Sequence, residues 1–149
     1  MKKSNIFAPG NRRKINPDWF TGPVYMKDIS SVIQSQGHDI YHVHFERGAK
    51  TKLHEHNGNQ ILIAVQGKGR LEFFKKTSKS TIKKTKSISL NNGDVAYIPK
   101  NTLHTHGSAE PKKLFSHIAI NILPTKKSPY KTVWYESDFA KSVSGIIKS

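Results

Sequence analysis

The sequence predicts an all-β protein, built as a sandwich or barrel of short strands. Two-residue alternation dominates the chain, as in segment 39–46, where Tyr41, Val43 and Phe45 fall on one face. Short strands recur at intervals of about ten residues, with Gly, Asn or Pro at the breaks between them. Helical periodicity is scarce, and the one helix we expect is a short C-terminal one over residues 137–143.

The expected strands follow one another through the middle of the chain. They cover 39–46, 60–65, 70–74, 87–90, 95–98, 103–106 and 114–123. A length of 149 residues with no repeat and no change of composition argues for a single domain. We expect an irregular N-terminal arm over 1–22, a β-barrel over 23–136, and a C-terminal tail or short helix over 137–149.

Charge is the most unusual feature of the composition, with a formal net charge of +15. Many of the lysines gather between Lys75 and Lys86, where no aromatic residue or Arg is interleaved with them. Because aromatic rings and Arg favour base stacking and bidentate phosphate contacts, this pattern favours a solvated basic hairpin over a nucleic-acid or polyanion site. The sequence has no Cys and no apolar run long enough to cross a membrane, so we expect a cytoplasmic location.

A histidine pair carries the first chemical signal. His54 and His56 are two positions apart, which on a strand puts both imidazoles on the same face, where they can reach one metal ion. Gly48 lies six residues before His54, Gln60 lies four residues after His56, and Gly67 closes the run.

A second segment has a matching organisation. It begins at Gly93, continues through Pro99 and Asn101, and places His104 before Ser108. Together the two segments resemble the paired motifs of the cupin superfamily, in both residue types and spacing. The resemblance implies a single-domain cupin fold, a jelly-roll β-barrel.

Three positions depart from the superfamily pattern: Gln60 replaces a Glu, Asn101 a Gly and Ser108 an Asn. Gln60 is the informative departure, because an amide oxygen can bind a metal but brings no charge. Gln at this position is usual in small cupins of the manganese-dependent hydroxynitrile lyase group (mandelonitrile lyase type), which the chain also resembles. That resemblance rests on the segments 18–25, 104–108, 116–120 and 134–136.

The resemblance implies one divalent transition-metal ion, with Mn favoured and Fe, Ni or Zn as alternatives. Four side chains would hold the ion: His54, His56, Gln60 and His104. It also implies that His106 and His117 line the same pocket as candidate catalytic residues. An imidazole there that is not bound to metal could act as a general base near neutral pH.

These expectations lead to a metal-dependent cupin enzyme that acts on a small organic molecule, with lyase-type chemistry such as cyanohydrin cleavage. Two alternatives stay open at the level of sequence. One is an Fe(II)-dependent dioxygenase-type cupin, and the other is a non-catalytic cupin that binds a metal or a small ligand. The resemblance further implies a homodimer or homotetramer.

Overall fold

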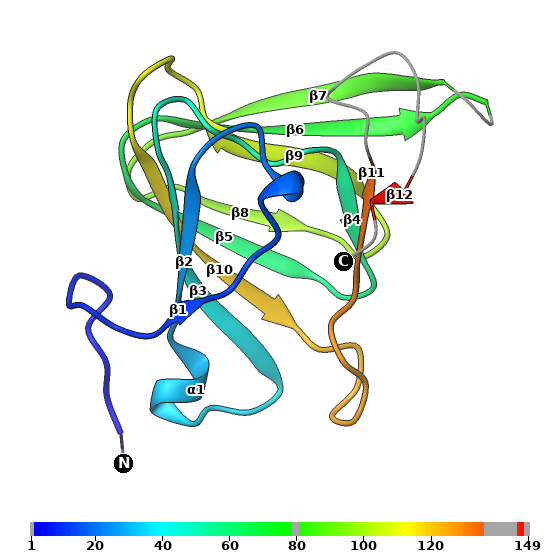
Figure 1. Ribbon diagram of the computed structural model, residues 1–149. Coiled ribbons are helices and arrows are strands. Elements are labelled where there is room, and N and C mark those ends of the chain that lie inside the picture. Colours follow the sequence, from blue (N-terminus) through cyan, green and yellow to red (C-terminus); the bar gives the residue numbers. More distant parts are fainter. Residues whose placement is uncertain (1, 79–80, 136–145, 148–149) are drawn as a thin grey trace.

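A computed structural model describes residues 2–78, 81–135 and 146–147 of the chain. Two six-stranded antiparallel sheets face each other (Figure 1). The first sheet has the order β1-β2-β3-β10-β5-β8 and the second the order β12-β11-β4-β9-β6-β7. The strands are β1 (Arg12–Arg13), β2 (Val24–Asp28), β3 (His38–Phe45), β4 (His54–His56), β5 (Gln60–Gln66), β6 (Gly69–Lys76), β7 (Ile82–Leu90), β8 (Val95–Ile98), β9 (Leu103–Ser108), β10 (Phe115–Ile122), β11 (Thr132–Tyr135) and β12 (Ile146–Ile147).

Helix is nearly absent from the described residues, and the all-β prediction is confirmed. They contain one 3-10 helix, Pro17–Trp19, and one short helix, α1 (Ser30–Ile33). Helix α1 was not predicted, because a single turn is too short to show a helical period. Neither segment is long enough to cross a membrane. The C-terminal helix expected over 137–143 lies outside the described residues.

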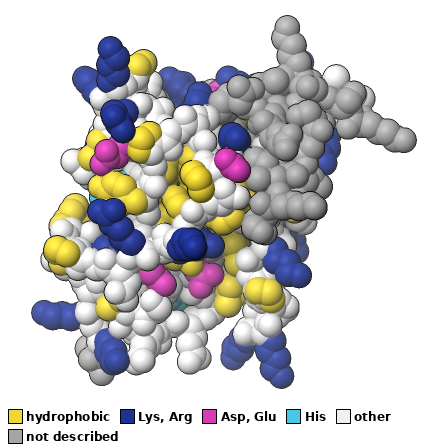
Figure 2. Space-filling view, in the orientation of Figure 1, with side chains coloured by type: hydrophobic (Ala, Val, Ile, Leu, Met, Phe, Trp, Pro, Cys, Tyr) yellow, Lys and Arg dark blue, Asp and Glu magenta, His cyan; other side chains and the backbone are white. Residues whose placement is uncertain are grey.

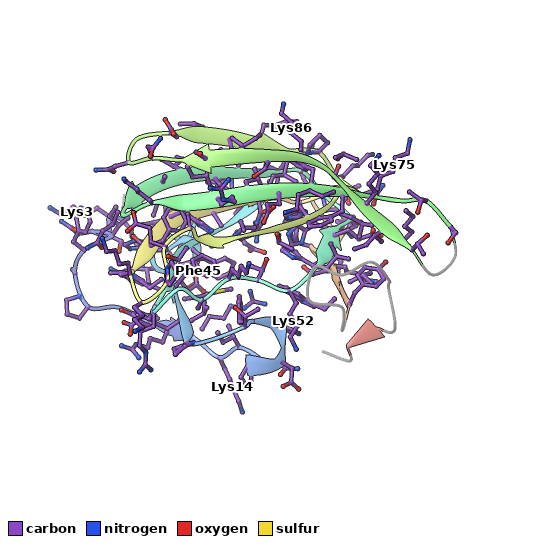
Figure 3. The ribbon with its side chains drawn as sticks, turned by 90° about the horizontal axis from the view of Figure 1, so that it is seen from above. Lys3, Lys14, Phe45, Lys52, Lys75 and Lys86 are labelled. Atoms are coloured by element: carbon purple, nitrogen blue, oxygen red, sulfur yellow. The ribbon has the colours of Figure 1, made fainter. Side chains whose placement is uncertain are left out.

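Strand alternation builds the core between the two sheets. Along β5, the buried side chains are Gln60, Leu62 and Ala64, and the residues between them are more exposed. Phe45 lies between the sheets and is fully buried (Figure 3). The same inward face therefore carries both apolar residues and the polar Gln60, so the barrel interior is partly a polar cavity.

Strand β7 begins before the expected start at residue 87, because the lysine-rich segment continues the ladder with β6. Its lysines are exposed, and the ammonium of Lys84 pairs with the carboxylate of Glu72. Lys75 and Lys86 both lie on the outer surface of this hairpin (Figure 3). Strand β7 is the last strand of its sheet, where exposed lysines discourage pairing with another chain.

Strands β2 and β11, like helix α1, were not predicted from the sequence. Strand β11 is only four residues long and shows no clear alternation of exposed and buried residues. It forms because it pairs with β4, which sets Thr132 opposite His56 and Trp134 opposite His54. This pairing brings the C-terminal part of the chain next to the histidine motif.

The N-terminal arm is partly ordered by contacts with the first sheet. Strand β1 pairs with β2, and the Lys27 ammonium contacts the carbonyl oxygens of Asn5 and Ala8. His42 points away from the barrel interior, yet only 1% of it is exposed, because the arm covers it. Its Nδ1 lies 2.9 Å from the carbonyl oxygen of Ile6. Few histidines therefore reach the surface, and almost none is visible in Figure 2.

Two motif glycines, Gly67 and Gly93, adopt left-handed backbone conformations, with φ of +76° and +92°. They differ in their surroundings. A Cβ at Gly67 would collide with the carbonyl oxygen of Leu114, whereas nothing lies within 4 Å of a Cβ at Gly93. Of these two glycines, only Gly67 is required by both its conformation and the space around it.

We expect Gly67→Ala to lower the free energy of unfolding by about 2–4 kcal/mol, because strain and a backbone collision add together. Gly93→Ala is the matched control, and its loss of about 1 kcal/mol comes from conformation alone. Urea unfolding followed by circular dichroism measures both values. Equal losses would contradict the collision at Gly67.

Candidate metal centre

The structure brings the four predicted metal ligands to one place inside the barrel. His54 and His56 come from β4, His104 comes from the neighbouring β9, and Gln60 comes from β5 of the facing sheet. The register sets His54 directly opposite His104, with ring centroids 4.1 Å apart. The His56 ring lies 4.9 Å from that of His54 and 5.2 Å from that of His104. All four side chains are buried.

Backbone carbonyls two residues earlier in the chain fix two of the rings. His54 Nδ1 lies 2.9 Å from the carbonyl oxygen of Lys52, and His104 Nδ1 lies 2.7 Å from that of Thr102. A carbonyl oxygen only accepts hydrogen bonds, so in each neutral ring the proton is on Nδ1 and the lone pair is on Nε2. Both rings therefore present a lone pair in the form that a metal ion requires.

Side chains from other strands orient the remaining two groups. His56 Nδ1 lies 2.8 Å from the hydroxyl oxygen of Thr132, on β11. The Gln60 amide nitrogen donates to Asn121 Oδ1 at 2.8 Å, so its carbonyl oxygen is directed away from Asn121. Thr132 and Asn121 were not predicted as parts of the site. Thr132 lies 76 residues from His56 in the chain, and Asn121 lies 61 residues from Gln60, so no local pattern connects them.

Three polar atoms in this cluster are buried and lack any hydrogen-bond partner among the described residues: His56 Nε2, Gln60 Oε1 and His104 Nε2. Leaving a buried polar atom unpaired costs about 1–3 kcal/mol. Gln60 Oε1 and His104 Nε2 present lone pairs, and His56 Nε2 presents one when its Nδ1 donates to the Thr132 hydroxyl. The donor set therefore fits a divalent transition-metal ion, which would satisfy all of them at once.

Burial keeps these imidazoles uncharged. Removal from water lowers the pKa of His54 well below its usual value, and the neighbouring His104 and His56 lower it further. The pKa of His56 is also well below its usual value, mainly through burial, although the Gln60 side chain raises it slightly. Burial lowers the pKa of His104 to about 4. Near neutral pH the rings are therefore unprotonated and able to bind metal.

His106 and His117 form a hydrogen-bonded pair beside this cluster. His117 Nε2 lies 3.0 Å from His106 Nδ1, and both rings are buried. Burial is the main cause of a lowered pKa in both rings. It lowers the pKa of His106 well below its usual value and that of His117 to about 3. Nitrogen atoms of His54, His104 and His106 also lie within 4.8 Å of one another, so His106 could take part in metal binding.

The direction of the proton in this pair separates two roles for His106. If His117 donates from Nε2, then His106 accepts at Nδ1 and carries its own proton on Nε2, where it cannot bind a metal. His117 Nδ1, which is buried without a partner, then offers a lone pair. If His106 donates instead, its Nε2 is free for a metal and His117 Nδ1 carries a proton.

Aromatic residues close one side of the cluster. Trp134 stacks on the His54 ring at 4.3 Å, and Trp19 stacks on Trp134 at 5.1 Å. Tyr130 lies 4.8 Å from the His56 ring. The packing of Trp19 and Trp134 therefore reaches a candidate ligand, which only the pairing of β11 with β4 could reveal.

Comparison with known proteins identifies the family. A cupin family profile matches residues 4–137. A cupin-like protein from Thermotoga maritima has 33% sequence identity, with a TM-score of 0.61 over 95% of this chain and 92% of that one. The chain therefore belongs to the cupin family.

More distant solved structures share the fold. A cupin superfamily protein from Desulfitobacterium hafniense has 20% identity and a TM-score of 0.51, over 67% of this chain and 77% of that one. Oxalate decarboxylase from Bacillus subtilis, which has Mn(II) centres, has 24% identity and a TM-score of 0.56, over 74% of this chain but only 27% of the decarboxylase. A search of curated proteins finds no match.

We expect added Mn²⁺, Fe²⁺, Ni²⁺ or Zn²⁺ to raise the midpoint of thermal unfolding, because an ion that binds only the folded state stabilises it. A shift of several degrees should disappear on addition of a chelator, and it is measured by differential scanning fluorimetry. The double variant His54→Ala/His104→Ala is the control and should show no shift. An equal shift in this variant would place the binding elsewhere.

Proposed function

We propose that this cupin is a metal-dependent enzyme that acts on a small organic molecule by lyase-type chemistry. Its metal would be held by His54, His56, Gln60 and His104. The observation that carries this proposal is the group of three buried polar atoms on His56, Gln60 and His104 that have no hydrogen-bond partner among the described residues. His54 completes the set, because its Nδ1 is engaged by a carbonyl and its ring packs against two of the other ligands.

The proposed ligand set is electrically neutral. A bound divalent ion would keep its full charge and supply strong polarisation of a substrate oxygen. Mn is the favoured ion, with Fe, Ni or Zn as alternatives. Trp134 and Tyr130 pack on two of the histidines and cover their ring faces, which reduces the contact of these rings with water. Such shielding strengthens the electrostatic effect of the site on any bound group.

His117 is the proposed general base, and His106 is its positioning partner. With His117 donating from Nε2 to His106, the unpartnered Nδ1 of His117 can take a proton from a substrate hydroxyl. In cyanohydrin cleavage, His117 would take the hydroxyl proton as the carbon–carbon bond breaks and the aldehyde forms, and the departing cyanide would receive that proton from His117 to leave as hydrogen cyanide. His106 holds the acceptor nitrogen that keeps His117 in this tautomer.

The setting of the enzyme stays a prediction. We expect a cytoplasmic homodimer or homotetramer, as the resemblance implies. Val95 and Tyr97 support self-association, because both are more than half exposed, at 67% and 55%, on β8 at the end of its sheet.

Single substitutions distinguish the two possible ligand sets. We expect His56→Ala to weaken metal binding by about 100-fold or more, because a direct ligand is lost. His106→Ala should retain close to one metal ion per chain, since this ring pairs with His117 in the proposed tautomer. Elemental analysis after dialysis measures both contents. Metal lost from the His106 variant and kept in the His56 variant would establish the set His54, His104 and His106 instead.

The role of His117 is tested with mandelonitrile as the probe substrate. We expect His117→Ala to slow release of benzaldehyde by about 100-fold or more while the metal content stays unchanged. The assay is run with and without oxygen, because turnover that needs oxygen would favour the dioxygenase alternative. Unchanged turnover in the His117 variant would contradict its role as base. Absence of turnover in the fully metal-loaded protein would favour the non-catalytic alternative for this substrate.

A further inference from the structure

Strand register places an arginine from the N-terminal arm on the same inner face as His117. Arg13 pairs with Met26, Met26 pairs with Val43, and Val43 pairs with His117. Because neighbouring residues across a ladder point to the same side of a sheet, these four side chains form one row across four adjacent strands. Val43 and His117 lie in the barrel interior, so Arg13 forms the outer end of this interior row.

Contacts hold the Arg13 guanidinium over the opening of the barrel. Its Nη1 lies 3.9 Å from Met26 Sδ. The guanidinium carbon lies 4.9 Å from the centroid of the Tyr41 ring and 6.0 Å from that of Trp19. These contacts leave the donors of the planar fork without a strong acceptor, while the aromatic rings stabilise the charge.

Two cavities meet at Arg13. One is a small interior cavity of about 40 Å³, which His54, Gln60 and His117 also line. The other is a wider cavity of about 440 Å³ at the mouth, which Tyr130 and the two tryptophans help to form. Arg13 belongs to the lining of both, together with Met26 and Trp134, so its side chain lies where the two cavities approach each other.

The positive charge of Arg13 has no carboxylate partner among the described residues. Among the described residues, the lining of the two cavities contains no Asp or Glu. Asp28, the one acidic residue of β2, has its carboxylate occupied by the Ser31 backbone N–H and the Ser30 hydroxyl. The ion pairs of the described chain do not include Arg13. Lys131, in the lining of the mouth, adds a further positive charge.

We infer that the pocket takes a small organic acid and that Arg13 binds its carboxylate at the mouth. The interior is lined by Phe20, Val43 and Phe45 as well as by the polar cluster, so the acid has a short apolar body. An arginine fork and a carboxylate have matching bidentate geometry, which fixes the orientation of the bound acid. The claim that this acid is the substrate rests on the proposed function. The claim that Arg13 binds it does not.

The two tryptophans of the chain provide a direct readout, because Trp19 and Trp134 both lie at this mouth. Titrations with lactate and mandelate are compared with titrations using their neutral amides, lactamide and mandelamide, and tryptophan fluorescence reports binding. We expect each acid to bind about 10- to 100-fold more tightly than its amide, as one charge-assisted bidentate contact would give. The protein is titrated in both its metal-free and its metal-loaded form.

Arg13→Gln should remove this preference, and Arg13→Lys should keep only part of it, because lysine has the charge but not the fork. Arg12→Gln is the matched control. Arg12 is the neighbouring residue of the same strand, but its guanidinium lies over Tyr25, 4.6 Å from the ring centroid, and does not line either cavity. Arg12→Gln removes the same charge as Arg13→Gln and should leave the preference for acids unchanged.

Equal affinity for acids and amides, no saturable binding of either acid, or equal losses in the Arg12 and Arg13 variants would each overturn the inference. These outcomes are distinct from failure of the proposed function. A protein that prefers acids through Arg13 but shows no metal-dependent turnover would support the binding site and contradict the enzyme. A metal-dependent enzyme without this preference would support the proposed function and contradict the binding site at Arg13.

Discussion

The interior of this barrel holds buried polar atoms that have no hydrogen-bond partner among the described residues. Carbonyl oxygens of Lys52 and Thr102 occupy one nitrogen of His54 and His104, so the other nitrogen of each ring points toward the cluster. Asn121 does the same for the Gln60 amide. The atoms that these contacts leave unpaired cost folding free energy when the site is empty, and their lone pairs favour a positively charged partner. The proposed chemistry depends on this arrangement.

Burial and neutrality act together in the same cluster. Burial and dense packing of the imidazoles lower their pKa values, and the described residues of the interior lining include no Asp or Glu that would raise them again. A metal ion held there would have only neutral ligands, and the mouth adds Arg13 and Lys131. The cavity as a whole is therefore electropositive when loaded, which favours anionic ligands and disfavours cations.

Much of the site could be predicted from sequence because its geometry is local. His54 and His56 share a face through strand alternation, and the two ring-fixing carbonyls lie only two residues before their histidines. The second motif supplied His104 at a recognisable spacing from its glycine. Strands with clear alternation, such as β3 and β10, and the apolar run of β5 were also predicted close to their observed bounds. The lysine-rich start of β7 was not, because cross-strand pairing with β6 decides its conformation and its own composition gives no signal.

The sequence by itself determined the all-β fold class, the cupin resemblance and the set of candidate ligands. Only the tertiary structure decided what surrounds them. Trp134 stacks on His54 because β11 pairs with β4, and Arg13 reaches the pocket because β1 adds to the edge of the other sheet. Alternation along one strand depends on neighbouring residues, but the register between strands depends on contacts between residues far apart in the chain. No pattern within either segment specifies those contacts.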